Sequence, residues 1–300
     1  MDTRPLSREI RESIAKGDFA SALEMLRRQA HSRATPRREG TAEREPLSLT
    51  EVCNGSEVTV RTPGGEVGCC SVHRGLREAA PENAGIAREY SAVLRGARQR
   101  FDDDAALGAS AALCHAADAD PGDLLFMRIE TCGPGEAIVF LIGMMQYTDG
   151  DLVFDQCLAR DCREEPAILQ VFADRCAEAR VLVTFNGMAR DMSMVRQRSA
   201  FHDIELPRRR TPHLDLLREA RRRWRGDVPN LRLETLEQRV CGRRRVGDIP
   251  GRQIPQAYER FVETGDARQI GEVLHHNMLD LLTMAQLVVA ILTGCGPVVG

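Results

Sequence analysis

One short run of residues, 124–133, constrains the fold of this chain more than any other stretch. Its first four residues are apolar, the next ones alternate in character, and the run stops at a Gly-Pro-Gly turn. Such a run predicts a buried central strand that ends in a turn. Because alternate residues of a strand point to the same face, Arg128 and Glu130 share one face of this strand. Two charges on one face near a strand end favour an active-site floor over ordinary core.

Two further segments place an acid at the end of an element or on a helix. A β-branched run over 181–185 predicts a second buried strand, and Asp191 follows it at the expected start of a helix. Asp280 lies on a long helix that apolar periodicity predicts over 271–292. Together with Glu130, these carboxylates come from three distant segments of the chain. A set of this kind that converges in the fold suits divalent metal ions.

Five short motifs follow one another along the chain. They are Arg-Ile-Glu-Thr-Cys-Gly at 128–133, Thr-Phe-Asn-Gly at 184–187 with Asp191, His-Leu-Asp-Leu-Leu at 213–217, Asp-Ile-Pro-Gly at 248–251 and His-Asn-Met-Leu-Asp at 276–280. In this order they resemble the YprB-type branch of the RNase H-like DEDD exonucleases, over about residues 120–293. The resemblance implies an aspartate at the position of Arg128. Three of the family's four carboxylates therefore remain.

The expected fold is α/β, with a mixed five-stranded sheet of the RNase H-like kind and helices on both faces. This domain is expected to span 120–296. Ahead of it, the sequence predicts a small helical and hairpin region. That region consists of an N-terminal helix over 1–30, a polar linker over 31–50 and a segment over 51–119 with a hairpin at Gly64-Gly65.

The resemblance implies that Glu130, Asp191 and Asp280 bind Mg²⁺ or Mn²⁺ and act in phosphodiester hydrolysis. It assigns His276, one helical turn before Asp280, to orienting or deprotonating the attacking water. Arg128 is the degenerate position, because it lacks the carboxylate that the family has there. A fixed cation at this point repels a divalent ion even at an effective dielectric of ~20. One ion, or none, is therefore expected. A guanidinium can instead occupy the place of a metal and pair with Glu130 or Asp191.

Other residues are candidates for contact with nucleic acid. Thr131 and Asn186 stand beside the acids in their motifs, although Asn186 equally suits a left-handed turn next to Gly187. Three adjacent arginines on a predicted helix could form a basic track that binds the sugar-phosphate backbone of a nucleic acid: Arg221, Arg222 and Arg223. The alternative for this helix is a solvated face with Trp224 buried in the core.

Composition bounds these expectations. The net charge is −3 and the pI is near 6.2, so the overall field does not favour nucleic acid. Locally, residues 201–250 hold 13 arginines against 8 acids. The ten cysteines show no paired CxxC spacing, so a zinc site is not indicated. No signal segment or apolar run of membrane-spanning length is evident, which predicts a cytoplasmic protein with no membrane partner.

Two functions from different classes follow. The first is a metal-dependent 3′–5′ exonuclease that acts on single-stranded DNA or RNA and is impaired by Arg128. The second is a catalytically inactive RNase H-like module that binds nucleic acid, or a protein partner through the N-terminal helix. Because a fold does not fix a function, Arg128 is the residue that distinguishes them.

Overall fold

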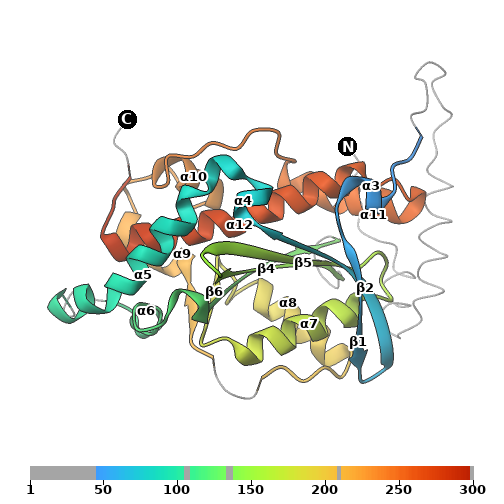
Figure 1. Ribbon diagram of the computed structural model, residues 1–300, viewed down its shortest axis with the longest axis horizontal. Coiled ribbons are helices and arrows are strands. Elements are labelled where there is room, and N and C mark those ends of the chain that lie inside the picture. Colours follow the sequence, from blue (N-terminus) through green and yellow to red (C-terminus); the bar gives the residue numbers. More distant parts are fainter. Residues whose placement is uncertain (1–44, 105–108, 133–137, 208–210, 298–300) are drawn as a thin grey trace.

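The computed structural model describes residues 45–104, 109–132, 138–207 and 211–297. The helix predicted over 1–30 and most of the predicted linker lie outside these residues, as does the arginine run 208–210. Within them, the chain forms an α/β fold with one mixed sheet and helices on both faces (Figure 1). The predicted fold class is therefore confirmed.

The sheet has seven strands in the order β1-β2-β5-β4-β3-β6-β7, not the five that the sequence predicts. Their bounds are β1 Ser56–Thr62, β2 Gly65–Gly75, β3 Leu124–Thr131, β4 Val139–Thr148, β5 Asp151–Leu158, β6 Val181–Thr184 and β7 His213–Asp215. The five expected strands are β3 to β7. The other two form the predicted hairpin, whose strand β2 pairs antiparallel with β5 over Cys70–Gly75. Strand patterning identifies the hairpin but not the sheet edge on which it pairs.

Helices pack on each side of this sheet. On one side lie α7 (Glu165–Glu178) and α8 (Asp191–Phe201), and the other side is covered by α12 (Arg268–Thr293) with α5 (Gly85–Asp104) beside it (Figure 1). The remaining helices are α3 Leu49–Val52, α4 Leu76–Ala79, α6 Ala111–Ala117, α9 Leu216–Trp224, α10 Leu233–Arg239 and α11 Ile254–Thr264, with 3-10 turns η1 Pro81–Asn83, η2 Pro121–Asp123 and η3 Gly251–Gln253.

The central strand β3 divides the core. Leu124 and Phe126 belong to the apolar cluster under α5 and α12, whereas Leu125 and Met127 belong to the cluster under α7. Alternation then carries Arg128 and Glu130 onto the α12 side of the sheet. The two charged residues therefore face the helix that supplies His276 and Asp280.

Helix α12 has the length and hydropathy of a membrane span, contrary to the expectation from sequence. However, 89% of its most apolar window is buried inside the fold, so its apolar surface is already covered. Among the described helices it is the one that meets this length and hydropathy test. Its hydrophobic length is that of a core helix packed between the sheet and α5.

An amide contact docks α12 on the sheet. Gln156 on β5 donates a hydrogen bond to the Asn277 side chain (3.1 Å) and another to the carbonyl of Leu274 (2.7 Å). Gly143 on β4 leaves the space for Asn277, because a Cβ there would lie 1.8 Å from Asn277 Oδ1. The register of α12 over β3 is therefore fixed beside the charged residues.

Candidate functional site

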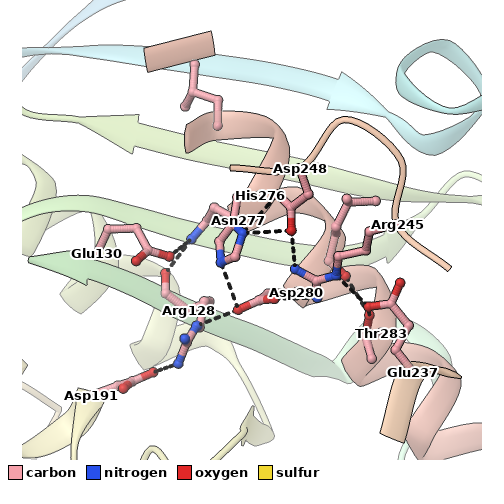
Figure 2. Close-up of polar contacts among 12 residues, drawn as sticks. Arg128, Glu130, Asp191, Glu237, Arg245, Asp248, His276, Asn277, Asp280 and Thr283 are labelled. Carbon is pink, nitrogen blue, oxygen red and sulfur yellow. Dashed lines mark hydrogen bonds and ion pairs between the residues drawn. The ribbon is translucent and has the colours of Figure 1, made fainter. Parts of the chain in front are cut away.

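The acidic and histidine residues expected from sequence meet at one place in the fold. Glu130 comes from the end of β3, Asp191 from the first turn of α8, and His276 and Asp280 from α12 (Figure 2). All four side chains are buried. These segments are distant in the sequence, and they meet in the fold as the motifs imply.

Arg128 lies among these carboxylates. Its Nε donates to Asp280 Oδ2 at 2.9 Å, and its Nη1 lies 3.5 Å from Asp191 Oδ2 (Figure 2). The side chain keeps 27% of its surface exposed, whereas those of Asp191 and Asp280 are almost fully covered. The guanidinium is therefore the positive group that two of the carboxylates share.

A second guanidinium holds the other oxygen of Asp280, and sequence reasoning missed it. Arg245 Nη2 donates to Asp280 Oδ1 at 2.5 Å. The same side chain donates to Glu237 Oε2 at 2.6 Å and to Asp248 Oδ2 at 3.0 Å. Asp248 belongs to the Asp-Ile-Pro-Gly motif, so an arginine three residues before that motif was the available signal.

His276 is held by Asp248. Its Nδ1 lies 2.9 Å and 3.0 Å from the two carboxylate oxygens of Asp248, and its Nε2 lies 3.9 Å from Asp280 Oδ2. Burial acts to lower the pKa of His276, but the hydrogen bond to Asp248 and the charges of Asp280 and Glu130 raise it above its usual value. His276 is therefore more readily protonated than a free histidine side chain.

The three carboxylates do not titrate alike. Burial raises the pKa of Glu130 to about 7, although Arg128 acts in the opposite direction. Burial also raises the pKa of Asp191. Burial acts in the same way on Asp280, but Arg128 and Arg245 outweigh it, so the pKa of Asp280 lies below its usual value. Asp280, with a guanidinium on each oxygen, is the carboxylate that stays ionised most firmly.

As arranged, these side chains do not fit a divalent ion. No group of three or more His, Cys, Asp or Glu residues in the described part of the chain is placed to hold a metal. Arg128 bridges Asp191 and Asp280, and both oxygens of Asp280 already accept from guanidiniums. A metal ion needs the same oxygens, and a fixed cation beside them opposes it.

Arg128, His276 and Asp280 also line an open groove of about 630 Å³. Its other basic residues are Arg190, Arg232 and Arg252, and its apolar residues are Phe185, Leu217, Leu231, Leu233 and Pro250. With Glu234 and Asp280 as its acids, the lining carries a formal charge of +2 when His276 is neutral. The three outer arginines are scattered singly along the sequence, in the turn before α8, at the start of α10 and in η3, so no local run of charge marks them.

Asn186 lies in this groove and in a left-handed turn at once. Its φ is 59°, and its side chain is part of the lining. Asp215 holds the turn, since its Oδ1 accepts from the Asn186 amide at 2.9 Å and its Oδ2 from the Met188 amide at 3.1 Å. The same carboxylate caps α9 through the amide of Leu217. One side chain thus joins two walls of the groove.

The other predicted nucleic-acid contacts lie elsewhere. Thr131 is half-buried at the end of β3, and it is not among the described residues that line the groove. Arg222 and Arg223 approach Glu219 on their own helix, at 3.8 Å and 2.8 Å, while Trp224 is buried. Arg221, Arg222 and Arg223 therefore lie on the last turns of α9 rather than in the groove, which α9 meets through Leu217.

Comparison with known proteins places the chain in a family. A family model described as the RNase H superfamily matches residues 125–292, which is more than half of the chain. The chain is 32% identical over 169 residues to the uncharacterised protein YprB of Bacillus subtilis, covering 55% of this chain and 41% of that protein. It thus spans less than half the length of that relative.

A solved structure is also similar, more weakly. The family B DNA polymerase from the hyperthermophilic archaeon Pyrobaculum calidifontis matches with a TM-score of 0.45 and 16% identity, over 55% of this chain and 24% of that one. A likeness of this size carries no argument about function. The family match covers the central strand, the helix that supplies His276 and Asp280, and the groove between them. The chain belongs to the RNase H superfamily.

Proposed function

We propose that this protein binds single-stranded DNA or RNA in the groove without a divalent ion and does not hydrolyse it. The observation that carries the proposal is the Arg128 guanidinium, which bridges Asp191 and Asp280. Membership of the RNase H superfamily supports nucleic acid as the ligand class. Metal-dependent exonuclease activity, which the motif order implies, requires ions where this guanidinium lies.

The charges favour the metal-free alternative. At about 4 Å and an effective dielectric of ~20, two unit charges interact by about 4 kcal/mol, so a divalent cation beside Arg128 costs about 8 kcal/mol. Conversely, an arginine in place of an aspartate changes the formal charge of the site by the amount that one divalent ion adds. Arg128 therefore supplies to a polyanion part of the attraction that a bound ion would supply.

The groove suits an unpaired strand. Arginines on its lining match phosphates, and the apolar wall of Phe185, Leu217 and Leu231 offers a surface for bases. A duplex has its bases paired and stacked inside, so it leaves that wall without a partner. The mixed lining therefore favours single-stranded DNA or RNA.

The test is a fluorescence anisotropy titration with a labelled single-stranded oligonucleotide, in EDTA and in Mn²⁺. We expect equal affinity in both buffers and no shortening of the strand. A triple variant with Arg190→Gln, Arg232→Gln and Arg252→Gln should bind more weakly and with a flatter salt dependence. Each phosphate contact adds about 0.7 to the slope of log K against log salt for single strands, so three contacts should remove about 2.

The matched control changes three exposed arginines outside the groove, Arg61→Gln, Arg88→Gln and Arg95→Gln, with the same loss of charge. If this control lowers the slope as much as the groove variant, the attraction is diffuse and the groove is not the site. Binding that requires Mn²⁺ would contradict the metal-free proposal. A third variant, with Arg221, Arg222 and Arg223 changed to Gln, tests whether α9 extends the track.

A further inference from the structure

The Asp280 carboxylate at the floor of the groove is already hydrogen-bonded through both of its oxygens. Asp280 accepts from Arg245 on one oxygen and from Arg128 on the other. Asp191 turns one oxygen to Arg128, and Glu130 lies 3.5 Å from the amide nitrogen of Asn277. A hydroxyl group that donates to Asp280 must therefore compete with two guanidiniums.

The hydrogen-bond donors of Arg128, by contrast, are not all used by these contacts. A guanidinium has five N–H groups, and the bonds of Arg128 to Asp191 and Asp280 use one at Nε and one at Nη1. Arg128 lines the groove with 27% of its side chain exposed, so part of this donor edge is open. Two carboxylates hold the planar group in place, and a held guanidinium matches phosphate oxygens two at a time.

The depth of Arg128 decides which phosphate can reach it. Arg190, Arg232 and Arg252 are exposed, whereas most of the Arg128 side chain is covered. A phosphodiester within a strand carries one charge and is bonded on both sides, so it suits the exposed arginines. A terminal phosphate carries about −1.5 to −2 at neutral pH and three free oxygens. Its three free oxygens can accept from the N–H groups of Arg128 that the bonds to Asp191 and Asp280 leave open.

We infer that the groove recognises the end of a single strand that carries a terminal phosphate, in preference to an end with a hydroxyl. Arg128 binds the terminal phosphate, and Arg190, Arg232 and Arg252 contact the phosphates that follow. This inference rests on the proposed function and names the strand end that the site takes.

The experiment uses three labelled oligonucleotides of one sequence, in EDTA, with the full chain. One has hydroxyls at both ends, one a 3′-phosphate and one a 5′-phosphate. We expect one phosphate-ended strand to bind about tenfold more tightly than the hydroxyl-ended strand, the effect of about one charge-assisted hydrogen bond. The arm that gains affinity identifies the end that enters the groove.

Variants locate the effect. Arg128→Gln should bring the affinity ratio between the phosphate-ended and hydroxyl-ended strands to about one, and Arg61→Gln should leave it near ten. If Arg128→Gln does not fold, as judged by thermal melting, Arg128→Lys takes its place. Lysine keeps the charge without the planar fork, so the ratio should fall to an intermediate value. An unchanged ratio in the folded Arg128 variant overturns the inference.

Three other outcomes count against it in different ways. Equal affinity for all three strands, with the groove variant still weakened, overturns recognition of a phosphate end but leaves the proposed function standing. Absence of binding to every strand removes the proposed function itself. A nucleoside monophosphate that competes as well as the phosphate-ended strand overturns the requirement for a strand.

Discussion

The side chains of Arg128 and Glu130 lie on the same face of β3, but their surroundings favour the charged form of Arg128 and disfavour that of Glu130. Arg128 turns towards Asp191 and Asp280 and forms ion pairs with both. Glu130 has only the amide of Asn277 within hydrogen-bond reach among its described contacts. Burial raises the pKa of Glu130 to about 7, and the charge of Arg128 only partly opposes this rise. One residue of the pair is therefore firmly charged at neutral pH, and the other is close to losing its charge.

This difference predicts a dependence of stability on pH. Because the folded pKa of Glu130 is about 7 and the usual value is 4.5, the folded chain holds this proton more tightly than the unfolded chain. Stability should therefore fall as pH rises from about 4.5 to 7, by about 3 kcal/mol from this group alone. Asp191 and His276 also have raised pKa values, so Glu130→Gln should reduce the fall in stability between pH 5 and pH 7.5 in urea unfolding without abolishing it. Glu66→Gln, an exposed control on β2, should leave the fall unchanged, and an equally large fall in Glu130→Gln would show that Glu130 does not contribute to it.

The substitution Arg128→Asp tests whether this arginine prevents metal binding at the site. The change restores a fourth carboxylate beside Glu130, Asp191 and Asp280, so Mn²⁺ should bind and raise the melting temperature of the variant. Wild type should show no shift in Mn²⁺ or EDTA. The variant should also cut a labelled single strand in Mn²⁺, and adding Asp280→Asn should abolish both effects. Wild type that cuts as fast as the variant would show that Arg128 does not prevent metal binding.

At the scale of elements, the site depends on how closely α12 approaches the sheet. Asn277 lies over Gly143 on β4, accepts from Gln156 on β5 and donates towards the Arg128 carbonyl on β3 at 3.3 Å. Three strands thus fix one turn of α12. His276 and Asp280 lie on that turn and the next, so the docking contact also sets their positions.

Gly143→Ala should disturb this contact. The new Cβ would lie 1.8 Å from Asn277 Oδ1 and 2.7 Å from its Cγ, so α12 must shift or Asn277 must leave its hydrogen bonds. Overpacking of this kind costs about 1–3 kcal/mol, measurable by urea unfolding. Gly64→Ala, where the nearest atom is 3.8 Å away in the hairpin turn, should change stability by less than about 0.5 kcal/mol. Equal stability of the two variants would mean that the helix shifts without cost.

Local patterns in the sequence account for much of the molecule as a whole. Period-2 alternation identifies β3, and apolar periodicity identifies α12 to within a few residues of its ends. The motif at 213–217 is rich in leucine, but only His213–Asp215 forms a strand, because the Asp215 carboxylate caps a helix that starts at Leu216. A side chain that bonds to its own following backbone overrides an apolar pattern.

The features that the sequence does not predict are contacts between residues that lie far apart along the chain. Arg245 and Asp280 are 35 residues apart, and Arg245 comes from a loop with no periodic pattern. The pairing of β2 with β5 joins residues about 80 positions apart, from Gly75 with Val153 to Cys70 with Leu158. Overall charge also misled, because a chain of net charge −3 places a positive groove beside its buried acids. Such features follow from the assembled fold rather than from any single segment.

The pairing of Arg128 and Arg245 with Asp280 limits which substitutions this sequence can accept during evolution. Removing one partner of a buried ion pair leaves the other charge stranded, at a cost of about 3–5 kcal/mol. Substitution of Asp280 is therefore penalised by instability whether or not the protein cuts anything. An acidic motif typical of nucleases can thus persist in a chain without nuclease chemistry. Surveys of genomes that count such motifs will overestimate the number of active enzymes unless they also read the residue at the position of Arg128.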